Sequence, residues 1–212
     1  MRDKFNEQLD QLHIEMIEMG ALCEDAISAA AESLLKSDPE MAKRAKECEK
    51  AIDDKEHDVE TRCLRLLLQQ QPVASDLREI SSALKMISDL ERIGDQAADI
   101  AELTPYITGD TTGHIGDMAR AACEMVSESV GSFVKRDLDM ARAVMASDDH
   151  MDALFDAVKF DLIAMIGGDS AKGELGLDLL MVAKYFERIG DHATNVAEWV
   201  EFSITGVHPQ SN

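Results

Sequence analysis

Apolar residues recur every three or four positions along most of the chain, which is the spacing of one face of an α-helix. Short polar stretches with proline, glycine or aspartate interrupt this spacing, as is typical of turns between helices. Asp38 and Asp137 stand where they would cap the following helices, and Pro39 fits a first helical position. The pattern predicts six long helices, over residues 5–35, 39–68, 77–103, 114–136, 138–166 and 174–205.

The second half of the chain repeats the first. A shift of 96 residues places Leu90–Asp95, LERIGD, on Phe186–Asp191, FERIGD, and a shift of 99 places Asp53 on Asp152. A tandem duplication of a three-helix unit, with a shorter turn in the second copy, is the simplest explanation. We therefore expect an all-α fold, a tandem repeat of two three-helix bundles. The expected division is a first repeat over 1–104, a linker over 105–113, a second repeat over 114–205 and a loose tail over 206–212.

The charge of the chain narrows the choice of partners. Its 42 acidic residues against 21 basic ones give a net charge of −21. Nucleic acids and anionic lipid surfaces would be repelled on average, whereas metal cations and basic protein surfaces would be attracted. Solubility alone is the alternative explanation for this charge.

Neither cysteine spacing nor hydropathy indicates an exported or membrane-spanning protein. The four cysteines form no C-x-x-C pair, so we expect reduced thiols packed in the core. The first residues lack the apolar segment of a signal peptide, and no apolar run approaches the ~18 residues of a membrane span. We therefore expect a cytoplasmic protein that reaches a membrane only through its partners.

Acidic residues four positions apart occur on the second and third predicted helices of both repeats. Residues at this spacing are neighbours on a helix surface. Within each antiparallel hairpin the two pairs are equidistant from the turn, so the four carboxylates should lie level with one another. The first acidic site comprises Glu49, Asp53, Glu91 and Asp95, and the second comprises Asp148, Asp152, Glu187 and Asp191.

Four carboxylates on one patch repel one another unless they are protonated, solvated or neutralised. Oxygen ligands suit Mg²⁺, Mn²⁺, Ca²⁺ or iron, so both sites are predicted to bind metal, with Asp99 and Asn195 as further candidate ligands. The alternative is a solvated acidic face that Arg92 and Arg188 partly neutralise. Gly94 and Gly190, inside the acidic pairs, fit either close helix approach or room for a cation.

The sequence carries no recognisable catalytic motif, and we expect no enzymatic activity. No glutamate has a histidine three residues later, so the Glu-x-x-His pair of di-iron carboxylate bundles is missing. Two alternatives remain open beside a metal-binding regulator. One is a carboxylate-bridged metal-storage or oxidase bundle, and the other is a metal-free structural adaptor.

The repeated LERIGD and FERIGD segments, together with Gln71–Arg78, QPVASDLR, resemble the PhoU family of phosphate-signalling proteins. The resemblance extends over residues 5 to about 203. It implies a pair of three-helix bundles that bind multinuclear iron or zinc clusters through E(D)-x-x-x-D motifs, which fall here on the two acidic sites.

The resemblance also implies partners and a biological role. The expected partners are the ATPase subunit of a phosphate ABC transporter and a sensor histidine kinase, and the expected role is repression of the phosphate-starvation response when phosphate is ample. A homodimer is expected as well. The turn Gly167–Gly173 differs in sequence from the corresponding turn of the first repeat, and Asn195 stands where the first repeat has Asp99. The second site is therefore open to a different metal content.

Overall fold

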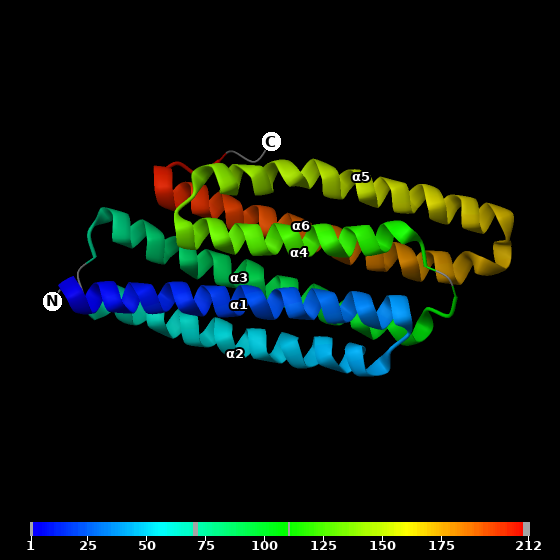
Figure 1. Ribbon diagram of the computed structural model, residues 1–212, viewed down its shortest axis with the longest axis horizontal. Coiled ribbons are helices and arrows are strands. Elements are labelled where there is room, and N and C mark those ends of the chain that lie inside the picture. Colours follow the sequence, from blue (N-terminus) through cyan, green and yellow to red (C-terminus); the bar gives the residue numbers. More distant parts are fainter. Residues whose placement is uncertain (1, 70–71, 110, 210–212) are drawn as a thin grey trace.

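The computed structural model describes residues 2–69, 72–109 and 111–209. In this part of the chain six long α-helices are joined by short turns, and there is no strand (Figure 1). The helices are α1 Arg2–Lys36, α2 Pro39–Gln69, α3 Ala74–Leu103, α4 Gly113–Lys135, α5 Leu138–Gly168 and α6 Gly173–Thr205. Short 3-10 helices, Thr104–Tyr106 and Ser170–Lys172, follow α3 and precede α6. The predicted all-α fold is confirmed.

The predicted division into repeats, linker and tail runs over several residues that lie outside the described part, namely residues 1, 70–71, 110 and 210–212. Within the described part, α3 ends just before the expected linker and α4 begins at the linker's last residue, Gly113. Among the described residues, no helix is both long and apolar enough to cross a bilayer.

Both predicted caps are present. The backbone N–H of Glu40 donates to Oδ1 of Asp38 at 2.9 Å, and that of Met140 donates to Oδ1 of Asp137 at 3.0 Å. Each carboxylate thus satisfies one of the N–H groups that a helix leaves unpaired in its first turn. These caps fix where α2 and α5, the outer helices of the two repeats, begin.

Each repeat forms one three-helix bundle, and the two bundles lie side by side (Figure 1). Helix α3 packs along α6 and α1 packs along α4, while α2 and α5 lie on the outer sides. Gly20 of α1 lies against Val130 of α4, and Ser28 lies beside Cys123, so α1 and α4 run antiparallel. The acid-bearing hairpins, α2–α3 and α5–α6, therefore each combine one outer helix with one helix of the central layer.

The core consists of the apolar stripes of all six helices. Four methionines of α1 and α4 are buried there, and three of the four cysteines are buried free thiols. These methionines are Met16, Met19, Met118 and Met125. Buried thioether and thiol side chains act as apolar packing groups. This packing role agrees with the lack of metal-binding or redox cysteine motifs in the sequence.

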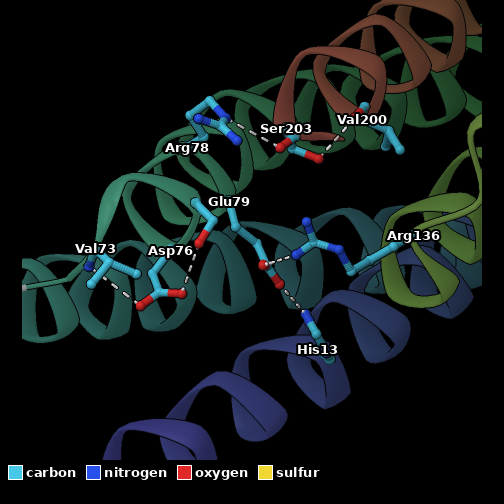
Figure 2. A network of polar contacts seen from close by, with 9 residues as sticks. His13, Val73, Asp76, Arg78, Glu79, Arg136, Val200 and Ser203 are labelled. Atoms are coloured by element: carbon cyan, nitrogen blue, oxygen red, sulfur yellow. Dashed lines mark hydrogen bonds and ion pairs between the residues drawn. The ribbon is translucent and has the colours of Figure 1, made fainter. Parts of the chain in front are cut away.

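A buried carboxylate joins three helices near the N-terminal end of α3 (Figure 2). Glu79 is 3% exposed, its Oε1 lies 2.7 Å from Nε2 of His13 in α1, and its other oxygen accepts from Arg136 at the end of α4. The ring of His13 also packs edge-on against Phe133 of α4, with centroids 5.5 Å apart. This network links the first repeat to the second, because a buried carboxylate must keep its partners.

Candidate metal site

Glycine lets the two acid-bearing helices of each repeat approach closely. A Cβ added to Gly94 of α3 would lie 2.9 Å from Cδ1 of Ile52 in α2. A Cβ added to Gly190 of α6 would lie 3.1 Å from Cγ of Met151 in α5. Each glycine stands between the Glu and the Asp of an acidic pair, so the close approach also brings that pair to the neighbouring helix. Close helix approach is thus a sufficient reason for both glycines.

Three carboxylates of the first acidic site converge. One oxygen from each of Glu49, Asp53 and Asp95 lies within 4.8 Å of the other two. Oxygen ligands bind Mg²⁺ or Ca²⁺ at roughly 2.0–2.6 Å, so oxygens around one ion stand at most about 4–5 Å apart. In the described part of the chain, this is the one group of three or more His, Cys, Asp or Glu side chains with such spacing. The donor set therefore fits a hard or borderline cation.

Glu91 and a residue that sequence reasoning missed, Glu56, carry charges that act on this cluster. Burial raises the pKa of Glu91, repulsion from Asp95 raises it further, and Asp53 and Glu56 also contribute. Burial also raises the pKa of Glu56, which Asp53 helps to raise. The charges of Asp53 and Glu56 thus act on Glu91 across the hairpin, and the sharing of one metal site by Glu91 and Asp53 stays a prediction.

Burial and mutual repulsion disfavour the ionised carboxylate of Glu49, and the charge of Lys50 offsets them only in part. Burial raises the pKa of Glu49, with repulsion from Asp53 and Asp95 as the next causes. A bound cation would favour the ionised carboxylates and act against this shift. Beside the cluster, Glu49 and Asp95 also line a hollow of about 480 Å³ that reaches Asp99.

One basic side chain does reach the first site. The Nη1 of Arg92 donates to Oδ2 of Asp95 at 2.9 Å, and its Nε lies 3.4 Å from Oε2 of Glu91. The Arg92 side chain is 60% exposed, so solvent screens these pairs. This contact corresponds to the partial neutralisation that the sequence left open.

The charges of the four predicted residues of the second acidic site act on one another. Burial raises the pKa of Asp148, followed by repulsion from Asp152, with Asp149 and Glu187 as smaller causes. Burial likewise raises the pKa of Asp191, with Glu187 and Asp148 as further causes. Among the described residues, no three carboxylates here meet the spacing found in the first site.

The two outlying candidates, Asp99 and Asn195, both lie near the opposite bundle. Burial raises the pKa of Asp99, and Glu102 and Asp95 raise it further, whereas Arg188 of α6 lowers it. The side-chain amide of Asn195 donates to Oδ1 of Asp89 at 3.1 Å. Nδ1 of His192 lies 2.9 Å from the same oxygen. Asp89 was missed from the sequence, because the repeat carries Tyr185 at the equivalent position and gave no signal.

Known proteins are similar to this chain over nearly its whole length. A family model described as the PhoU domain matches residues 16–104 and again residues 115–200. A phosphate-specific transport system accessory protein PhoU homolog from Clostridium acetobutylicum is 37% identical over 210 residues, which cover 97% of this chain and 96% of the relative. A protein of the same description from Zymomonas mobilis is 35% identical over 206 residues, or 95% of this chain and 87% of the relative.

Two solved structures share the fold. The crystal structure of PhoU from Pseudomonas aeruginosa has a TM-score of 0.89 and 30% identity, and covers 96% of this chain and 100% of its own. The crystal structure of the phosphate transport system regulatory protein PhoU from Streptococcus pneumoniae has a TM-score of 0.90 and 25% identity, and covers 98% of this chain and 100% of its own.

Proposed function

This chain belongs to the PhoU family, and we propose that it is a regulatory accessory protein of phosphate transport whose acidic hairpin faces bind metal cations. The relatives' names describe an accessory protein of a transport system, which favours a regulator over an enzyme. Both repeats match the family model, so the proposal draws on the entire six-helix fold and not on one motif.

The convergence of Glu49, Asp53 and Asp95 within 4.8 Å is the observation that carries the metal-binding part of the proposal. In the first site, Glu49, Asp53, Glu91 and Asp95 would hold the cation, with Asp99 at its margin. In the second, Asp148, Asp152, Glu187 and Asp191 would do so. Oxygen ligands favour Mg²⁺, Mn²⁺, Ca²⁺ or iron, and the family resemblance favours iron or zinc clusters. A bound cation would supply the positive charge that lets α2 and α3 present their carboxylates together.

The proposed partners are the ATPase subunit of a phosphate ABC transporter and a sensor histidine kinase. Through them the protein would repress the phosphate-starvation response when phosphate is ample. A net charge of −21 favours basic contact surfaces on these partners and disfavours nucleic acid. We propose a cytoplasmic homodimer that its partners recruit to the inner face of the membrane.

A metal-free adaptor is the second candidate function. The observation that favours it is the contact of Arg92 with both Asp95 and Glu91, since a guanidinium supplies positive charge without any metal. Regulation would then survive removal of the carboxylates.

Metal analysis of the purified full-length chain tests the proposal. The double variant Glu91→Gln/Asp95→Asn is compared with Glu124→Gln/Glu128→Gln, which removes a four-spaced acidic pair exposed on α4. We expect bound metal in the wild-type chain, a lower content in the first variant and no change in the second. Full metal content in the Glu91→Gln/Asp95→Asn variant would show that this site assignment is wrong.

A further inference from the structure

The two acidic sites differ at two positions that alignment of the repeats makes directly comparable. Lys184 of α6 corresponds to Ser88 of α3, and Phe155 of α5 corresponds to Glu56 of α2. The first site thus has a fifth carboxylate where the second has an aromatic ring. The second has an ammonium group where the first has a small hydroxyl.

In the second site the Lys184 ammonium lies over the Phe155 ring and beside the Glu187 carboxylate. The Lys184 ammonium pairs with Glu187, one helical turn further along α6, and lies 5.6 Å from the centroid of the Phe155 ring. A cation over an aromatic face is attracted by the ring quadrupole. The Glu187 side chain is only 14% exposed, so its pairing with Lys184 is weakly screened by solvent.

The charge of Lys184 reaches further into the second site. It lowers the pKa of Asp191, against the effects of burial, Glu187 and Asp148. Two of the four candidate ligands therefore interact with one ammonium group that belongs to the protein. A divalent cation entering this site would meet that positive charge and would have to displace it from Glu187.

The basic residues beside the first site, Lys46, Lys50 and Arg92, are all exposed. The Arg92 side chain is 60% exposed, whereas that of Lys184 is 39% exposed and lies over a ring. In place of the ring, Glu56 adds negative charge beside Asp53 and Glu91. The tight group of three carboxylate oxygens also occurs here and not, among the described residues, in the second site.

We propose that Lys184, held by Phe155 and Glu187, is a built-in counter-cation that weakens divalent metal binding at the second site, so that the first site fills at lower metal concentration. This inference rests on the proposed metal-binding function. It explains the difference in metal affinity between the two sites by the side chain of Lys184. A single divalent ion and a metal cluster would both be weakened, because the positive charge of Lys184 repels either.

Equilibrium dialysis of the full-length chain against Mn²⁺ tests the inference. The second site is isolated in the Glu91→Gln/Asp95→Asn background, and Lys184→Ser is added. We expect the Mn²⁺ dissociation constant of the second site to fall about tenfold, the order expected of one charge a few ångströms away in a partly exposed site. Lys184→Arg, which keeps the charge, should retain the weak binding.

Lys159→Ser is the matched control. Its ammonium lies 5.0 Å from the same Phe155 ring but pairs with Asp156 at 2.5 Å, which is not a candidate ligand. This variant should leave Mn²⁺ affinity within about twofold of its parent. In the reciprocal experiment, Ser88→Lys in the otherwise wild-type chain should weaken the first site about tenfold, since Ser88 is exposed and accommodates the longer side chain.

Thermal melting, without and with Mn²⁺, is a second readout. With chelator present, Lys184→Ser should lower the melting temperature, because Glu187 and Asp191 lose a counter-charge, and added Mn²⁺ should then raise it more than in the wild-type chain. Unchanged or weaker Mn²⁺ binding in Lys184→Ser, while the wild-type chain binds the ion, would overturn this inference alone. Absence of Mn²⁺ binding by the wild-type chain would overturn the proposed function as well.

Discussion

Gly94 of α3 and Ile52 of α2 set the distance between the two helices that carry the first acidic site, because a Cβ on Gly94 would stand 2.9 Å from Cδ1 of Ile52. Ile52 is fully buried, so its side chain has little room to move away. The packing of one glycine thus determines whether Glu49 and Asp53 can meet Asp95.

Gly94→Ala should destabilise the protein by about 1 kcal/mol. Overpacking costs ~1–3 kcal/mol, and the better helix propensity of alanine returns ~1 kcal/mol. Urea denaturation measures the change. Gly167→Ala, where an added Cβ would meet no atom within 4 Å, should be neutral or slightly stabilising. Equal effects of the two substitutions would show that close helix approach is not why Gly94 is there.

Removal of the buried carboxylate that joins the bundles should cost considerably more. Glu79→Gln removes a negative charge that His13 and Arg136 both contact. A hydrogen bond to a charged group contributes ~1.5–3 kcal/mol to stability. We expect a loss of about 2–3 kcal/mol in the free energy of unfolding by urea.

The control for Glu79→Gln is Glu32→Gln, which removes an exposed pair with Lys36 and should cost less than about 1 kcal/mol. A loss in Glu79→Gln no larger than in this control would mean that the network of Figure 2 is not a structural link.

The raised pKa values predict how stability depends on pH in the metal-free chain. The pKa values of Glu49 and Glu91 lie above the ordinary value of 4.5, so the folded state holds protons that the unfolded state has released. Stability from these groups is therefore greatest at acid pH and is lost as pH rises above about 4.5 through the raised pKa values.

Glu49→Gln/Glu91→Gln removes this titration. In chelator at pH 7 the variant should melt at a higher temperature than the wild-type chain, and the difference should vanish near pH 4 (about the ordinary carboxyl pKa). Comparing the two proteins at each pH cancels the titration of carboxylates that do not interact with Glu49 or Glu91, and the relief of repulsion on Asp53 and Asp95 acts in the same direction. A variant that melts lower than the wild-type chain at pH 7 would contradict the repulsion described for the first site.

The contact between the repeats gives a further prediction. Asp89 accepts from Asn195 at 3.1 Å and lies 2.9 Å from His192, so Asp89→Asn should weaken the packing of α3 against α6. We expect a loss of about 1–2 kcal/mol in the free energy of unfolding, near the lower end of the ~1.5–3 kcal/mol of hydrogen bonds to charged groups, because the Asp89 and His192 side chains are both partly exposed. A variant as stable as the wild-type chain would show that this contact does not stabilise the packing of α3 against α6.

Much of the fold could be predicted because the information is local. Helix lengths follow from the apolar spacing, and the caps at Asp38 and Asp137 follow from residue type next to a break. The repeat then predicted two bundles, because the LERIGD and FERIGD segments indicate the same helical hairpin in both halves of the chain. The short 3-10 helix Thr104–Tyr106 was not predicted, because three residues carry too little pattern.

The acidic site was predictable only in part. Level heights follow from distances to the turn, but the rotation of each helix about its axis depends on packing that no single segment encodes. Glu56 was missed for this reason, and Asp89 was missed because Tyr185 stands at its position in the second repeat. Asn195, chosen for its spacing from Asp191, instead donates to Asp89 across the bundles. Lys184 and Phe155 are visible in the aligned repeats, yet only the folded hairpin brings them together.

The central claim is that the carboxylates of Glu49, Asp53 and Asp95 converge to bind a cation. Its most direct test is equilibrium dialysis of the full-length chain against Mn²⁺, with the triple variant Glu49→Gln/Asp53→Asn/Asp95→Asn beside the wild-type chain. We expect saturable Mn²⁺ binding in the wild-type chain and loss of its tighter component in the variant. The same binding curve for both proteins would contradict it.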